Sequence, residues 1–123
     1  MAGQYEPPTM KKGAAQQEKK SQLEEVIEKF NEHYAGEITS GDRILAGILM
    51  DKMSQDDVLR KSAQQDGEQI FVNSVFSKVY DKTAMDSYKE SRETFGALFS
   101  DPKKYAALKN ALAEIMYREF HRG

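Results

Sequence analysis

The sequence contains no cysteine and no tryptophan, and only 3 of its 123 residues are proline. Without cysteine the chain can form neither a disulfide framework nor a thiolate metal site, so a reducing compartment such as the cytoplasm is its expected location. Most of the 8 glycines stand where a helix would begin or end. This distribution favours helices over strands.

Long apolar runs are also missing. No stretch approaches the roughly 20 apolar residues that a membrane-spanning helix requires, and the N-terminus has no signal-peptide core. The formal net charge of −2 argues against a dedicated nucleic-acid-binding protein, because such proteins usually carry a strong basic excess. We therefore expect a cytoplasmic chain without a membrane segment. The charge balance does not exclude a local basic face.

The chain divides into a polar N-terminal stretch and a patterned remainder. Residues 1–20 are polar and show no periodicity, which predicts a flexible linker or tail. Residues 21–123 carry repeated apolar residues at helical spacing, and alternating strand patterns are largely absent. We expect these residues to form an all-α domain, a single compact bundle of about six helices.

The most apolar stretch is GEQIFVNSVFSKVY, residues 67–80, and we expect the bundle to pack around it. Its apolar residues recur at i, i+3, i+4 and i+7, as on one helix face, with Phe71 and Tyr80 on the flank. The other helices contribute similar faces. The expected core is Ile27, Phe30, Leu45, Leu49, Val72, Val75, Phe76, Val79, Leu108, Leu112 and Ile115.

Short polar motifs predict where helices begin. Thr39 or Ser40 caps a second helix, with Asp42 in its first turn. Asp101 followed by proline is the clearest start signal, because aspartate caps and proline fits the first helical position. Ser54 is expected to cap a short helix at residues 55–65, anchored by Val58 and Leu59. For residues 83–90, a continued helix and a loop both stay open.

The search for catalytic chemistry gives negative results. The two histidines, His33 and His121, fall in no spacing that is typical of a metal site. Gly36 and Gly41 have the glycine spacing of a phosphate-binding loop, but Asp42 follows where that loop needs a lysine. We therefore expect no catalytic, cofactor-binding or metal-binding residue in this chain.

Three lysines of the last helix, Lys103, Lys104 and Lys109, predict a basic edge. Lys103 and Lys104 stand at the positive end of the helix dipole, where cations are disfavoured. That placement indicates a use, such as contact with an acidic partner or with DNA phosphates. Ordinary solubilising charge is the alternative.

Residues 23–45, LEEVIEKFNEHYAGEITSGDRIL, resemble the opening of the C-terminal helical region of the R subunit of type I restriction enzymes. That region typically has a helix of the L-x-E-I-I-E-K-x-N-E-x-F-G kind and then a threonine-initiated turn with an aspartate. The counterparts here are Leu23, Val26, Ile27, Glu28, Lys29, Asn31, Glu32, Tyr34, Gly36, Thr39 and Asp42.

Later segments resemble the same family in order: residues 64–71, Asp101 with its proline, and residues 116–118. The resemblance thus covers about residues 23–120. It implies a parent enzyme that cleaves DNA, hydrolyses ATP with Mg²⁺ and translocates DNA, although none of its catalytic motifs is present here.

By this resemblance, the chain is a non-catalytic C-terminal domain that docks the R subunit onto the methyltransferase and specificity subunits. It would meet DNA only through the parent. Two other readings remain open: a free-standing helical adaptor or regulator that binds a protein partner, and a DNA-contacting module that uses the three lysines.

Overall fold

The computed structural model describes residues 22–122, which form helices joined by short turns and one longer loop. The first described helix covers residues 22–33. It is followed by α2 (Ser40–Met53), α3 (Asp57–Gln65), α4 (Glu68–Ile70), the π-helix η2 (Phe71–Phe76), α5 (Ser77–Glu90), α6 (Arg92–Phe99) and α7 (Pro102–Arg122). The all-α prediction is confirmed. Residues 1–20, the predicted tail, lie outside the described range.

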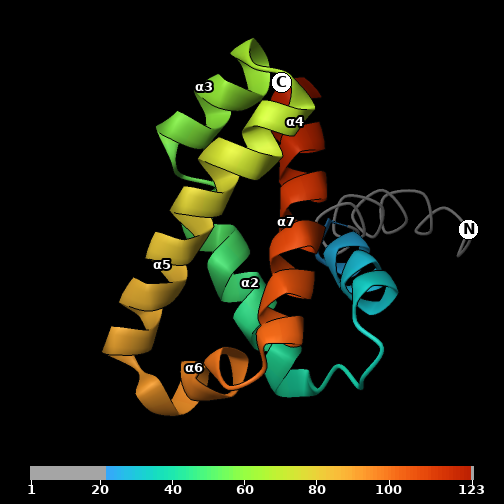
Figure 1. Cartoon of the computed structure of the whole chain (residues 1–123), viewed down its shortest axis with the longest axis vertical. Helices are drawn as coiled ribbons and strands as arrows, with labels where there is room; N and C mark the ends of the chain where they lie inside the picture. Colours follow the sequence, from blue (N-terminus) through green and yellow to red (C-terminus); the bar gives the residue numbers. More distant parts are fainter. Residues whose placement is uncertain (1–21, 123) are drawn as a thin grey trace, which may run out of the picture.

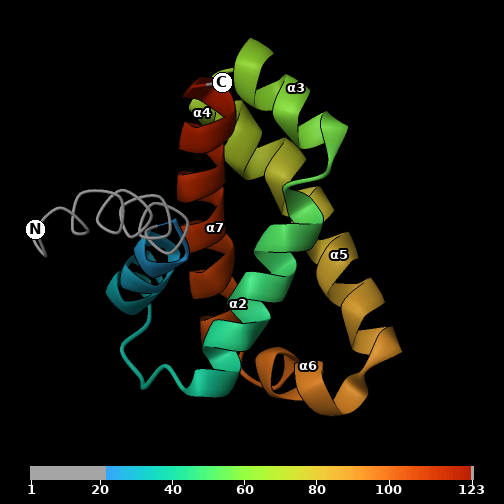
Figure 2. The same ribbon diagram turned by 180° about the vertical axis from the view of Figure 1, so that it is seen from behind.

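The longest labelled helix, α7, runs through the middle of the fold with 21 residues. Figures 1 and 2 show the 22–33 helix on one side of α7 and α2 and α5 on the other. α3 and η2 contact the C-terminal half of α7, and α6 and α2 contact α7 toward its N-terminal end. The bundle therefore packs around α7 as much as around residues 67–80.

Two predicted helix starts are confirmed. The Thr39 hydroxyl accepts a hydrogen bond from the Asp42 N–H (3.1 Å), and the Asp42 carboxylate accepts one from the Thr39 N–H (2.9 Å). This reciprocal capping box begins α2 at Ser40. Asp101 accepts hydrogen bonds from the N–H groups of Lys103 and Lys104, and α7 begins at Pro102.

The predicted start of the third helix was wrong. Asp56, rather than Ser54, caps α3, because its carboxylate accepts a hydrogen bond from the Leu59 N–H at 3.0 Å. Ser54 instead ends α2. As a result Leu59 is fully buried, whereas Val58 is 60% exposed and anchors nothing. Residues 83–90, for which helix and loop were both open, continue α5.

The apolar face of residues 67–80 is shifted from the predicted one. Phe71, Phe76 and Tyr80 are fully buried. The three valines of the predicted core, Val72, Val75 and Val79, are only partly buried and flank the core. The other predicted core residues are buried: Ile27, Phe30, Leu45, Leu49, Leu108, Leu112 and Ile115.

The π-helix explains this shift. Its hydrogen bonds join residues five apart, so a full turn contains more residues than an α-turn. Phe71 and Phe76, five residues apart, consequently share one face, with ring centroids 5.7 Å apart. Tyr80 follows Phe76 by four residues, as on an α-helix, and the centroids of these two rings are 6.0 Å apart. The prediction assumed α-helical spacing throughout and therefore placed the valines at the centre of the face.

The 22–33 helix is fastened to α7 by both apolar and polar contacts. Val26, Ile27 and Phe30 are almost completely buried beneath it. Polar pairs follow along its length: Gln22 with Glu119 (3.2 Å), Glu25 with Arg118 (two bonds of 2.8 Å), and His33 with Glu114 (2.9 Å). These contacts fix one wall of the groove described below.

Candidate functional site

Lys104, one of the three lysines of the predicted basic edge, points into the fold. Its ammonium lies 2.9 Å from the Asp42 carboxylate, and the two side chains are only 13% and 5% exposed. It also lies 5.4 Å from the centroid of the Tyr34 ring. The unfavourable position of Lys104 near the start of α7 is thus offset by a buried ion pair with the cap of α2.

Lys109 is engaged in a similar way. Its ammonium lies 3.4 Å from the Asp81 carboxylate and donates a hydrogen bond to the Ser77 hydroxyl. The same group stands 5.7 Å and 5.8 Å from the ring centroids of Tyr80 and Tyr105. Two of the three lysines of the predicted basic edge therefore pair with carboxylates of the fold, Lys104 in a buried pair and Lys109 in a partly exposed one. Their use by an acidic partner or by DNA stays a prediction.

Lys103 is the lysine of this set that remains exposed. It borders a hollow of about 560 Å³ beside the 34–36 segment, together with His33, Tyr34, Gly36 and Asn110. A single exposed cation differs little from ordinary surface charge. Lys103 is thus exposed without a second free lysine of this set beside it, because Lys104 and Lys109 pair with Asp42 and Asp81.

The polar contacts around the start of α7 shift several pKa values. A hydrogen bond from Tyr34 to Asp101 (2.7 Å) lowers the pKa of the Asp101 carboxyl. Burial alone would raise the pKa of Asp42, but hydrogen bonds from Thr39 and Lys104 outweigh it and lower that pKa. The hydrogen bond to Asp42 also raises the pKa of Lys104. The charged groups of Asp42, Asp101 and Lys104 therefore stabilise the fold, since each one is bonded to a partner within it.

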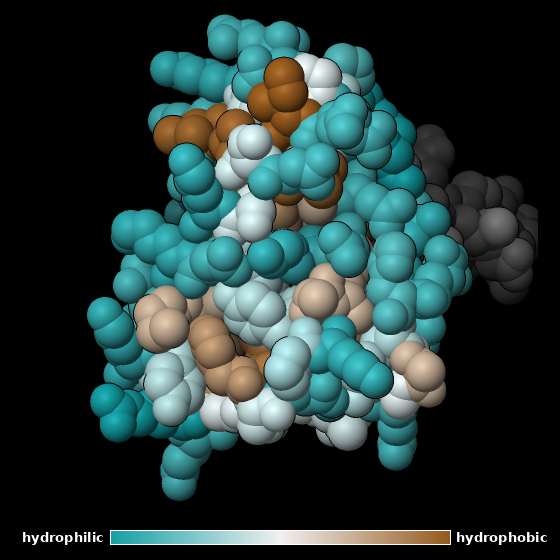
Figure 3. Space-filling view, viewed as in Figure 1, coloured by the Kyte–Doolittle hydropathy of each residue, from teal (hydrophilic) through white to brown (hydrophobic). Residues whose placement is uncertain are grey.

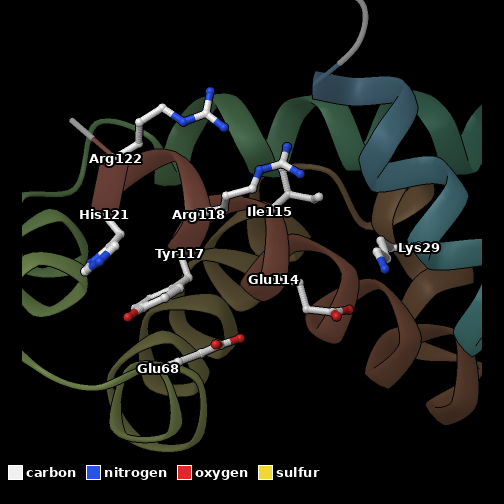
Figure 4. A pocket seen from close by; sticks show the side chains of 8 residues that line it. All are labelled: Lys29, Glu68, Glu114, Ile115, Tyr117, Arg118, His121 and Arg122. Atoms are coloured by element: carbon white, nitrogen blue, oxygen red, sulfur yellow. The ribbon is translucent and has the colours of Figure 1, made fainter.

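A groove of about 510 Å³ follows the C-terminal half of α7. Its floor is formed by α7 itself, including Ile115 and Tyr117, and its walls carry Lys29 from the 22–33 helix and Glu68 from α4. Figure 4 shows Arg118 and Arg122 along one edge, and Glu68 and Glu114 along the other. The groove is therefore lined mainly by polar and charged side chains of both signs, with Lys29 beside Glu114, and Ile115 is only 3% exposed.

The sequence contained a signal for this groove that was not used. Ile115, Arg118 and Arg122 stand at i, i+3 and i+7, so they share one face of α7. Basic residues at a helix C-terminus also complement the helix dipole, which accounts for them without any partner. Because the helix dipole already accounts for Arg118 and Arg122, the sequence offered no separate reason to place them beside a groove.

Exposed apolar side chains gather at the end of the molecule formed by α3 and α4. Val58 is 60% and Ile70 is 54% exposed. Figure 3 shows the strongest hydrophobic colour over this end, on a surface that is otherwise mostly hydrophilic. A smaller hollow with Val72 and Asn73 lies next to Ile70 and shares Glu68 with the α7 groove.

The histidines and carboxylates of residues 22–122 are placed for interhelical contacts. His33 pairs with Glu114, and the Nδ1 of His121 donates to the Ala63 carbonyl at 3.0 Å. No group of three or more histidines and carboxylates in this range could hold a metal ion. None of the helices described has the length and apolar composition needed to cross a bilayer.

Comparison of the chain with protein-family models, with curated proteins and with solved structures finds no match.

Proposed function

We propose that this chain is the non-catalytic C-terminal helical domain of a type I restriction enzyme R subunit. Its role is to dock the R subunit onto the methyltransferase–specificity core. The observation that carries the docking role is the apolar end of the molecule, where Val58 on α3 and Ile70 on α4, the next helix in the chain, are 60% and 54% exposed. The buried centres of protein interfaces are rich in apolar groups of this kind.

The contacts of the motif residues support the resemblance. Thr39 and Asp42 form the cap of α2, and Tyr34 donates a hydrogen bond to Asp101 at the start of α7. A Cβ atom at Gly36 would lie 2.6 Å from the Tyr34 ring, so glycine allows this close approach. Motif segments that are far apart in the sequence thus contact one another, as expected if they encode a shared fold.

In this proposal the catalytic chemistry belongs to the parent enzyme. The parent binds ATP and Mg²⁺, translocates DNA and cleaves it, whereas this chain provides an assembly surface in the cytoplasm. The chain reaches DNA only through the complex that it helps to assemble.

A free-standing adaptor that binds another protein is the second candidate, and the same apolar end supports it. The DNA-contacting candidate has less support, because Lys104 and Lys109 pair with Asp42 and Asp81. Binding of DNA by the isolated chain, weakening steeply with added salt, is the result that would favour that candidate.

The test of the docking role is size-exclusion chromatography of the full chain mixed with a methyltransferase–specificity core that binds intact R subunit. We expect one co-eluting peak. The double variant Val58→Asp/Ile70→Asp should abolish co-elution, because it places charges in the proposed interface. Ile44→Asp is the matched control, since Ile44 is also 60% exposed but lies on α2.

Two outcomes contradict the proposal. The first is separate elution of the wild-type chain under conditions where the intact R subunit binds. The second is ATP hydrolysis or DNA cleavage by the isolated chain. Loss of co-elution in the Ile44→Asp control as well would place the interface elsewhere on the molecule.

A further inference from the structure

We propose that residues 67–80 are a conformational device with two helical registers, which differ in whether Phe71 or Val72 is buried in the core. The structure shows the first register, in which η2 is a π-helix and Phe71 is fully buried. In the second register η2 becomes α-helical, and the residues at its N-terminal end each move by one position. Val72 then occupies the place of Phe71, and Phe71 occupies the place of Ile70, which is 54% exposed.

The stretch carries apolar side chains for both registers. With α-helical spacing, Val72 precedes Phe76 by four residues and lies on the same face. Val75 and Val79 complete that face, and all three valines already lie partly buried against the core. With the π-helix, Phe71 shares the face of Phe76 from five residues away. A change of register therefore replaces one apolar side chain in the core by another apolar one.

Helix geometry gives the size of the movement. α4, η2 and α5 follow one another without a break (Figure 1). In an α-helix each residue turns about 100° around the axis, so a residue five positions before Phe76 lies about 140° away from it. A residue four positions before lies only about 40° away. Phe71 can thus face the core only while η2 is a π-helix, and conversion turns Phe71 outward and Val72 inward.

The connection before η2 can take up the extra residue. α4 begins at Glu68 without a side-chain cap, and Gly67 before it is extended. A Cβ atom on Gly67 would meet nothing within 4 Å, so the backbone has room to move there. When the register changes, Glu68 leaves the helix and joins Asp66 and Gly67 in the connection between α3 and the following helix. The shift therefore requires no rearrangement of α3 or α5.

Aromatic contacts make the π-helical register the major state. The ring centroid of Phe71 lies 5.3 Å from that of Tyr117 and 5.7 Å from that of Phe76. Valine fills less of this space than phenylalanine, so the α-helical register is the minor state. Minor conformations of this kind are typically populated at about 0.1–10%. Conversion gains regular α-helical hydrogen bonds in exchange, since π-helices are rare and occur mostly as short segments at functional sites.

The exchange changes the apolar end of the molecule, which also carries Val58. With Phe71 in the place of Ile70, this end exposes an aromatic ring, and aromatic side chains dominate the binding energy of many interfaces. A partner that binds the ring selects the α-helical register. This consequence rests on the proposed docking function, whereas the two registers are a property of the chain alone.

The experiment is NMR relaxation dispersion on the full chain, which detects exchange on the microsecond-to-millisecond timescale. One variant lacks Ser74, an exposed residue of η2. Its deletion places Phe71, Phe76 and Tyr80 at i, i+4 and i+8, so a regular α-helix buries all three. The control variant lacks Lys82, whose side chain is 78% exposed on α5. That deletion removes a residue where there is no π-turn to absorb the change.

We expect exchange at the methyl groups of Val72 and Val75 in the wild type, and none in the variant that lacks Ser74. The melting temperature should fall by more than about 10 °C on deletion of Lys82 but not on deletion of Ser74. Absence of exchange in the wild type overturns the inference. The same exchange in the variant that lacks Ser74 also overturns it.

The substitution Val72→Phe tests the two registers without a deletion. A phenylalanine at this position fills the space of Phe71 in the α-helical register, so the population of that register should rise by about fivefold. The nuclear Overhauser contact between the rings of Phe71 and Tyr117 should weaken in parallel. An unchanged contact together with unchanged exchange overturns the inference. Because the spectra are recorded on the chain alone, failure of the chain to bind the methyltransferase–specificity core contradicts only the docking function.

Discussion

At the scale of single residues, the pair of Asp42 and Lys104 accounts most clearly for an otherwise unfavourable choice. Lysine near the start of a helix opposes the helix dipole. Here the buried carboxylate of Asp42, 2.9 Å away, compensates it and joins the start of α7 to the start of α2. The sequence showed that Lys104 is badly placed for a helix start, but it could not identify a partner that is remote in the chain.

Replacing Lys104 with methionine should destabilise the protein by about 3 kcal/mol, because it leaves the buried Asp42 carboxylate without its cation. The matched control is Lys109→Met. Its partner Asp81 is 52% exposed, so we expect a loss of about 1 kcal/mol or less. Urea denaturation at neutral pH measures both. Equal losses in the two variants would contradict the assignment of Lys104 to a buried pair.

Three carboxyls predict how stability depends on pH. Hydrogen bonds from Arg118 and Tyr34 lower the pKa values of Glu25 and Asp101. For Asp42, burial opposes ionisation, but the hydrogen bonds from Thr39 and Lys104 win and lower the pKa. Each group therefore binds protons less readily in the folded chain than in the unfolded one.

It follows that this stabilisation is complete above the unfolded pKa of about 4 and is lost as the pH falls through the lower folded values. We expect the free energy of unfolding to decline below about pH 4, in urea titrations at a series of pH values. The Asp42→Asn variant should show a shallower decline. An unchanged slope in that variant would mean that Asp42 does not contribute.

At the scale of secondary structure, the π-helix decides which residues of the 67–80 stretch are buried. Helix starts at Thr39 and Asp101 were predictable, because their capping groups act within a few residues. The π-helix was not, since no local motif in FVNSVF marks a change of hydrogen-bond spacing. The position of the buried face depends on that spacing, and it was therefore misplaced onto the valines.

Truncation of single side chains in the π-helix tests which of them are buried in the core. Phe71→Ala and Phe76→Ala should each cost roughly 3–5 kcal/mol, as large side chains lost from a close-packed core. Val72→Ala should cost only about 1 kcal/mol, because Val72 is partly buried. Chemical denaturation of the three variants provides the comparison. A larger loss for Val72 than for Phe71 would restore the α-helical face predicted from the sequence.

At the scale of the whole molecule, α7 both supports the core and presents the groove. Its buried face carries Leu108, Leu112 and Ile115, which the sequence identified from their helical spacing. Its uncovered face depends on how far apart the 22–33 helix and α4 stand, and spacing along the chain does not specify that distance. The core was therefore more predictable than the candidate site.

The most direct measurement is hydrogen–deuterium exchange of the full chain, alone and with the methyltransferase–specificity core. Docking through the apolar end predicts slower exchange on binding in residues 58–72, and little change in α5 and α6. Unchanged exchange throughout, or protection confined to α5 and α6, would contradict a docking surface at this end of the molecule.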